Sequence, residues 1–117
     1  MARRKDPVSE MRRGVLELAL LLHLDTGAAC GADVMSDLDR NTDGRLQVSE
    51  GALYPALHRM EKKGLLSHEW IRDVQGRKPR KYYSLTDEGR TRLAELLAAW
   101  HDLRGAVDAL EGGRGDA

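Results

Sequence analysis

Cationic side chains that could hold phosphate groups are concentrated between residues 49 and 81 of this chain. Residues 59–81 alone carry eight basic and three acidic groups, a net charge of +5, although the formal net charge of the whole chain is zero. An arginine can bind the two acceptor atoms that guanine exposes in the major groove, and a lysine can neutralise a backbone phosphate. The candidate DNA-contacting residues are Ser49, Tyr54, His58, Arg59, Lys62, Lys63, Arg77, Lys78, Arg80 and Lys81.

The first of these residues lie on a predicted amphipathic helix. Leu53, Leu57 and Met60 recur at i, i+4 and i+7, so they form one apolar stripe. His58 and Lys62 fall on the opposite face of the same helix. We therefore expect the apolar stripe to be buried and the cationic face to be exposed.

The exposed face offers two kinds of contact. His58 and Arg59 are the best candidates for base edges, whereas Lys62 and Lys63 suit phosphates, which fix register rather than sequence. The hydroxyl of Tyr54 could contact DNA, or the ring could pack as a half-buried flank of the helix. A solvated polar face without any ligand would have the same composition, so the helix alone does not distinguish DNA binding from an ordinary solvent-exposed surface.

A β-hairpin is predicted after this helix. Residues 67–72 and 80–85 have strand composition, and glycine and proline lie in the segment between them. Trp70 is expected to be structural, pairing across the hairpin. A helix that leads into a hairpin with a cationic tip is typical of a winged helix-turn-helix, and this combination favours DNA binding over a solvated surface.

The same two elements resemble a known family. GALYPALHRMEKKGLL at 51–66 and GRKPRKYYSLTDEGR at 76–90 resemble the PadR family of bacterial transcriptional regulators, and the resemblance extends from about Arg13 to the end of the last helix. A single helix after the hairpin is similar to the small subgroup of that family. One difference is Ala32, because the family usually has a tyrosine after the glycine that opens its second helix.

The resemblance implies a mainly α fold with a small β-hairpin, in which a winged helix-turn-helix precedes a long C-terminal dimerisation helix. It implies a homodimeric, sequence-specific regulator that binds a double-stranded operator and acts as a ligand-responsive repressor. It also implies that the chain is not an enzyme and needs no cofactor. The residues agree, because the four histidines are scattered and the spacing indicates no nucleophile–base constellation.

Composition sets further bounds. A chain of 117 residues with 41% hydrophobic residues forms one domain, or one domain with an extension. The mean hydropathy of −0.54 and the lack of a long apolar run argue against a membrane span, and we expect a cytoplasmic protein. Cys30 is the only cysteine, so an intrachain disulfide is impossible.

We expect four parts along the chain. Residues 1–7 form a flexible basic arm, 8–85 the winged-helix domain, 86–111 the dimerisation helix and 112–117 a disordered tail. Within the domain, the acidic helix at 31–39 supports the recognition helix rather than contacting DNA.

The last helix carries an apolar seam with alternating spacings of three and four residues, the pattern of a coiled coil. A helix that projects from so small a domain needs a second chain to cover it, which predicts a homodimer. Trp100 would lie near the dimer axis, either as a core residue or as a platform for a planar apolar effector, as in small PadR-like regulators. The residues of the effector and dimer interface are Leu93, Leu96, Trp100, Leu103 and Val107.

Residues 39–50 also match the calcium loop of an EF-hand, with Asp39, Asn41, Asp43 and Glu50 as oxygen ligands. The alternative is a polar connector in which Leu46 and Val48 form a brief strand and Ser49 caps the next helix. We favour the connector, without metal, because EF-hands usually occur in pairs and no second loop is present. A calcium-responsive interaction protein is the alternative function.

Overall fold

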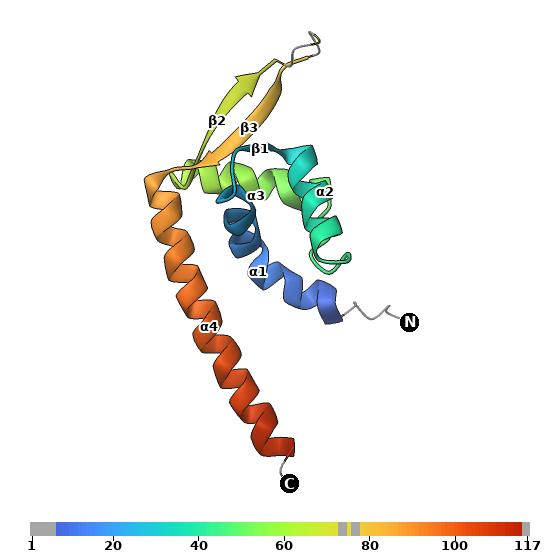
Figure 1. Cartoon of the computed structure of the whole chain (residues 1–117), viewed down its shortest axis with the longest axis vertical. Helices are drawn as coiled ribbons and strands as arrows, with labels where there is room; N and C mark the ends of the chain where they lie inside the picture. The colour runs from blue at the N-terminus through green and yellow to red at the C-terminus, as the bar shows by residue number, and fades with distance from the viewer. Residues whose placement is uncertain (1–6, 73–74, 76–77, 116–117) are drawn as a thin grey trace.

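The computed structural model describes residues 7–72, 75 and 78–115. A helical body carries a small antiparallel sheet, and the longest helix extends away from the body (Figure 1). The elements are α1 (Pro7–Leu24), β1 (Ala29–Cys30), α2 (Gly31–Asn41), α3 (Glu50–Lys62), β2 (Leu66–Ile71), β3 (Arg80–Leu85) and α4 (Asp87–Gly115). The predicted class is therefore confirmed, a mainly α winged helix-turn-helix with a long C-terminal helix.

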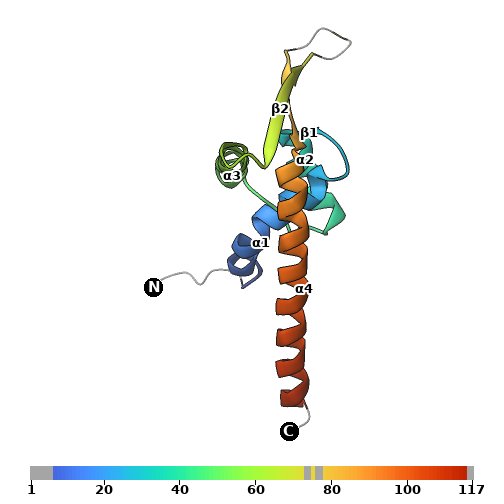
Figure 2. The same cartoon turned by 90° about the vertical axis from the view of Figure 1, so that its left-hand side faces the viewer.

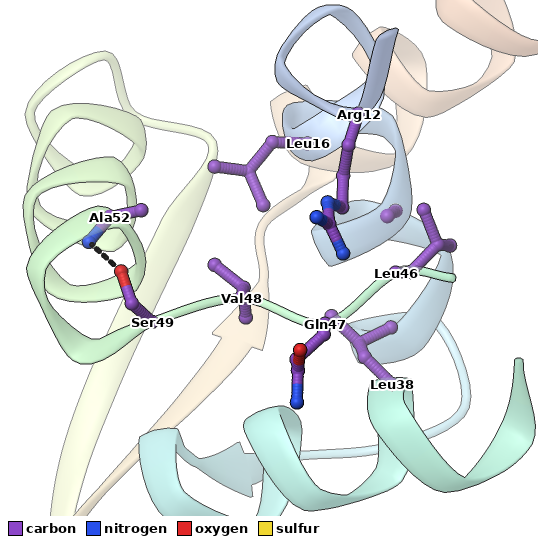
Figure 3. Close-up of a pocket in the computed structure, with 9 residues that line it drawn as sticks. Arg12, Leu16, Leu38, Leu46, Gln47, Val48, Ser49 and Ala52 are labelled. Carbon is purple, nitrogen blue, oxygen red and sulfur yellow. Dashed lines mark hydrogen bonds between the residues drawn. The ribbon is translucent and has the colours of Figure 1, made fainter. Parts of the chain in front are cut away.

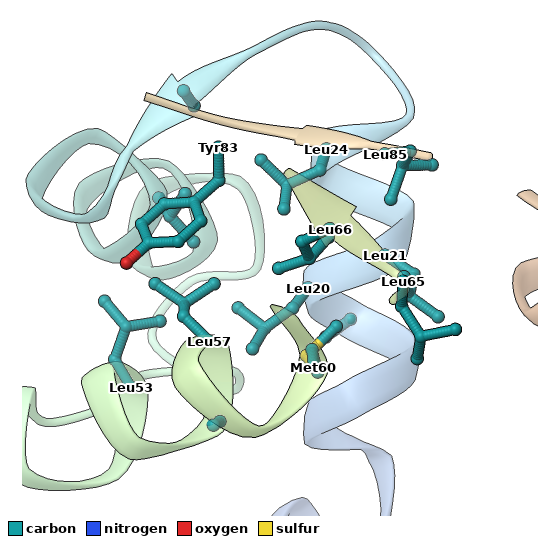
Figure 4. Close-up of a cluster of buried hydrophobic side chains, with 14 of the residues drawn as sticks. Leu20, Leu21, Leu24, Leu53, Leu57, Met60, Leu65, Leu66, Tyr83 and Leu85 are labelled. Carbon is teal, nitrogen blue, oxygen red and sulfur yellow. The ribbon is translucent and has the colours of Figure 1, made fainter. Parts of the chain in front are cut away.

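The core lies between α1, α3 and the sheet (Figure 4). Leu53 and Leu57 of α3 are completely buried, as are Leu20 and Leu21 of α1, and the Tyr83 ring of β3 points toward Leu53 and Leu57. Each fully buried leucine contributes about 1.5–3 kcal/mol relative to an exposed one. The apolar stripe predicted for α3 thus fixes which side of that helix faces the solvent.

The sheet contains one strand that the sequence did not reveal. The strand order is β1-β3-β2, and β1 pairs with β3 through Ala29 opposite Tyr83 and Cys30 opposite Tyr82. The predicted hairpin is formed by β2 and β3. The brief strand expected at Leu46–Val48 is wrong, because residues 42–49 contain only turns and irregular backbone.

Local hydrogen bonds define the ends of the helices around the hairpin. The hydroxyl of Ser49 accepts a hydrogen bond from the Ala52 amide at 3.2 Å, which confirms the predicted N-cap. At the other end of α3, Gly64 has a φ of 81°, the left-handed conformation that glycine tolerates best. The Thr86 hydroxyl accepts from the Gly89 amide at 3.0 Å and donates to the Gly64 carbonyl at 2.6 Å, so it links the ends of α3 and α4.

The outermost parts of the chain differ from expectation where they are described. α4 continues to Gly115, so residues 112–115 are helical instead of forming part of a disordered tail. α1 begins at Pro7, and the rest of the expected basic arm lies outside the described residues.

Figures 1 and 2 show that the hairpin and the free end of α4 extend in opposite directions. No helix in the described part of the chain is long and apolar enough to cross a membrane.

We expect Gly89→Ala to lower the free energy of unfolding by about 3 kcal/mol, because its Cβ would overlap the backbone carbonyl oxygen of Leu65. Gly105→Ala is the matched control, since nothing lies within 4 Å of a Cβ at that position. The control should raise the free energy of unfolding by about 0.5–1 kcal/mol through helix propensity alone. Denaturant unfolding of the two variants checks this, and equal effects would contradict the packing described for Gly89.

Candidate nucleic-acid interface

The outward face of α3 is polar and cationic. Leu53, Leu57 and Met60 are buried, whereas His58, Arg59 and Lys62 are exposed. His58 and Lys62 lie opposite the buried stripe and Arg59 lies on the flank, as the helical period requires. The structure therefore brings together three of the residues predicted to contact DNA on one helix face. Ser49 is exposed at the start of the same helix, with its hydroxyl engaged in the N-cap.

Tyr54 is positioned on the flank of α3 by a glycine of α2. A Cβ at Gly31 would lie 2.6 Å from the Tyr54 ring, so only glycine admits the ring so close to the backbone. The Tyr54 side chain is 44% exposed. Its pKa is raised, first by partial desolvation and then by the carboxylate of Glu50. The phenol therefore stays protonated at neutral pH and can donate a hydrogen bond to an anion.

A cluster of side chains that the sequence pattern does not predict joins α3 to the hairpin. The Glu61 carboxylate of α3 accepts a hydrogen bond from Nδ1 of His68 on β2, and Lys81 Nζ of β3 lies 3.7 Å from the same carboxylate. Lys81 Nζ also lies 5.1 Å from the centre of the Tyr83 ring. Part of the Lys81 charge is thus neutralised within the protein. In the sequence, the only indication of this cluster is Glu61, a single carboxylate among the basic residues at the end of the predicted helix.

The cations of the hairpin are divided between its two faces. Side chains alternate along a strand, so Lys81 and Arg80 point to opposite faces. Arg80 is exposed. Its pKa is raised, first by a hydrogen bond with Cys30, so the Arg80 side chain lies beside the start of α2. Lys78 is exposed near the tip, and Arg77 lies outside the described residues.

Lys63 does not share the face of Lys62. Its Nζ lies 3.6 Å from Glu17 of α1, and Arg92 of α4 lies 3.4 Å from the other oxygen of the same carboxylate. This arrangement turns Lys63 toward the groove between α1 and α4. Of the two lysines at the end of α3, only Lys62 is aligned with His58.

The apolar seam of α4 changes its environment along the helix. Leu93 is 6% exposed and Leu96 is half-buried, so both pack against the chain's own core. Leu103 is 63% exposed, and Val107 is similarly exposed. Trp100 lies between these two parts. It lines a groove of about 790 Å³ between α1 and α4, with Met11, Val15, Leu18, Leu96 and Leu103 among the other lining residues.

The connector between α2 and α3 is held by Arg12 of α1 (Figure 3). Its Nη1 donates to the carbonyl oxygens of Gly44 and Arg45 at 3.4 and 3.3 Å, beside a second groove of about 540 Å³. Asp39 and Asn41 lie in the last turn of α2, not in an open loop. Within the described residues, no three His, Cys, Asp or Glu side chains gather as metal ligands.

A sheet-flanked recognition helix with an exposed polar face defines a winged-helix protein of the transcription-regulator class. Residues 20–95 match the model of the Transcriptional regulator PadR-like family, so the chain belongs to this family. The resemblance seen in the sequence is thereby confirmed. The family consists of transcriptional regulators, which are not enzymes.

Relatives and solved structures agree with this assignment. The chain is 38% identical over 94 residues to the transcriptional regulator Rv3488 of Mycobacterium tuberculosis, which covers 80% of this chain and 83% of the relative. A PadR family transcriptional regulator from Eggerthella lenta is 38% identical, with a TM-score of 0.77 and coverage of 88% and 87% of the two chains. A PadR-like regulator from Bacillus cereus is 33% identical, with a TM-score of 0.76 and coverage of 86% and 95%.

We expect Lys62→Ala to weaken binding to duplex DNA and to reduce the slope of log affinity against log salt concentration by about one unit, because one phosphate contact is lost. Lys63→Ala removes the same charge one residue away but from a side chain directed at Glu17, and should change that slope much less. A salt series of fluorescence-anisotropy titrations compares the two. Identical slopes for the two variants would contradict the assignment of Lys62 to the exposed face of α3 and of Lys63 to the groove between α1 and α4.

Proposed function

We propose that this chain is a homodimeric repressor that binds a double-stranded operator. α3 enters the major groove, and the β2–β3 hairpin contacts the sugar–phosphate backbone. The observation that carries the proposal is the exposed face of α3, where cations lie opposite a completely buried stripe. In a two-fold dimer the two recognition helices would contact half-sites about 34–36 Å apart.

The roles of individual residues follow from their positions. His58 and Arg59 contact base edges, because they lie on the exposed part of α3. Lys62 and Lys78 hold phosphates, because they are exposed and form no ion pair with a carboxylate among the described residues. Arg80 is exposed as well and holds a further phosphate. Tyr54 donates its hydroxyl to the DNA backbone. Three further residues contribute to register rather than sequence: Ser49 at the helix start, Lys81 beside Glu61, and Arg77, which lies outside the described residues.

The proposed dimer forms through α4. Trp100, Leu103 and Val107 continue the stripe that begins with Leu93 and Leu96, but the chain's own core does not reach them. A second copy of the helix would remove these apolar side chains from water, which is the main driving force for such association. Residues 7–85 would then form the DNA-binding part and 86–115 the dimerisation helix.

The proposed effector is a planar apolar molecule that binds beside Trp100. The groove between α1 and α4 has the size and the predominantly apolar lining of a small-molecule site. An indole ring offers a large flat surface on which such a molecule can stack. Because α4 forms both the groove wall and the dimer interface, an effector there would change the distance between the two recognition helices.

A mobility-shift assay tests the proposed function, with the DNA immediately upstream of the chain's own gene and an unrelated duplex of equal length. We expect Arg59→Ala to weaken binding to the upstream segment by about 1–3 kcal/mol and to affect the unrelated duplex less, because base contacts are lost. Arg80→Ala should weaken both duplexes alike. Equal losses on both duplexes for both variants would contradict the assigned roles, and wild-type protein that binds neither would contradict the function.

We expect Leu103→Asp to convert the protein to a monomer of 13.0 kDa, because a charge at the exposed seam opposes apolar association. Helix content should be retained, since Leu103 is outside the core. Ala98→Asp introduces the same charge on the opposite face of α4 and should leave the mass at twice that value. Light scattering coupled to size-exclusion chromatography checks both variants, and a monomeric wild type would refute the dimer.

A further inference from the structure

Trp70 lies near the end of β2 with 63% of its surface exposed. The sequence predicts a structural tryptophan, but most of this ring faces solvent. A single exposed apolar side chain needs no explanation by itself. Trp70 differs from such a side chain, because it lies on the face of the hairpin that continues from the core and because the His68 ring contacts it.

Trp70 is on the face of the hairpin that looks toward α3. The antiparallel register places Leu66 opposite Leu85, His68 opposite Tyr83 and Trp70 opposite Lys81. Side chains alternate along a strand, so these six residues share one face. Leu66, Leu85 and Tyr83 are buried in the core beneath it. The same face therefore runs from the core to Trp70 and Lys81, where the hairpin extends beyond the body (Figure 1).

The indole ring is held in place from α3. The His68 ring meets it edge-on, with the ring centres 6.4 Å apart and an interplanar angle of 85°. His68 in turn is hydrogen-bonded to Glu61 of α3. Trp70 is thus an oriented aromatic surface that borders the corner between α3 and the hairpin, with Lys81 as its cross-strand neighbour.

We propose that Trp70 contacts DNA in this corner, against the sugar–phosphate backbone of the strand that passes between α3 and the hairpin. The inference rests on the proposed DNA-binding function and adds a residue to it. Deoxyribose carbons supply an apolar partner for the ring, and the indole N–H can donate to a phosphate oxygen. Lys81 supplies positive charge beside the ring. Contacts to the backbone carry no sequence information, so Trp70 adds affinity for any duplex.

Two substitutions of Trp70 and one of its neighbour test the proposal. Trp70→Ala should weaken binding to the upstream DNA and to an unrelated duplex by about tenfold each, and Trp70→Phe by a smaller factor because it keeps a ring. Ile71→Ala is the matched control, since Ile71 is exposed on the opposite face of the same strand. It should change either affinity less than twofold. Circular dichroism and thermal melting verify that all three variants fold.

Intrinsic fluorescence supplies a second readout. Saturating DNA should alter the tryptophan emission of a Trp100→Phe variant, in which Trp70 is the one remaining tryptophan. Trp70→Ala with the affinity of Ile71→Ala, or a Trp100→Phe variant that binds DNA without a change of emission, would overturn the proposal while the DNA-binding function stands. Absence of any DNA binding by the wild type would overturn both.

Discussion

The packing of α3 against α1 and the sheet is the constraint on which the rest of the molecule depends. Leu53 and Leu57 are completely buried, and Met60 is nearly so. Each contributes about 1.5–3 kcal/mol through burial. A rotation of α3 about its axis would expose this stripe, and exposed ion pairs, worth about 0–1 kcal/mol each, could not compensate. The buried leucines therefore determine that His58 and Lys62 face outward.

Two carboxylates form ion pairs with some of the cations around this helix. Glu17 holds Lys63 and Arg92 at the groove between α1 and α4, and Glu61 lies close to Lys81 at the hairpin. Ion pairs at a partly exposed surface contribute little to stability. The carboxylates instead affect where the cationic side chains point, and this determines which cations can reach an anionic partner. Net charge along the sequence cannot reveal this, since it counts neutralised and available cations alike.

Elements with strong periodicity were predictable, and those that depend on distant contacts were not. The stripe of α3 and the hairpin follow from local patterns, whereas the two residues of β1 form a strand only because β3 lies beside them. The glycines at 112 and 113 suggested a disordered end, yet the helix continues through them. The alternation of β2 places Trp70 on the same face as Leu66 and His68. It could not reveal that the core ends before Trp70, because that depends on the length and direction of α3.

The same limit applies to α4, whose whole seam was assigned to the dimer interface although its first part packs against the chain's own core. Leu93 and Leu103 belong to one apolar stripe, but the first is buried by its own chain and the second is exposed. A single rigid helix thus passes from the core to the proposed dimer interface. Its first turn is hydrogen-bonded through Thr86 to the carbonyl of Gly64, immediately after α3. A shift of α4 at the proposed interface would therefore act directly on the end of the recognition helix, and a ligand that favours one position of α4 would favour one spacing of the two recognition helices.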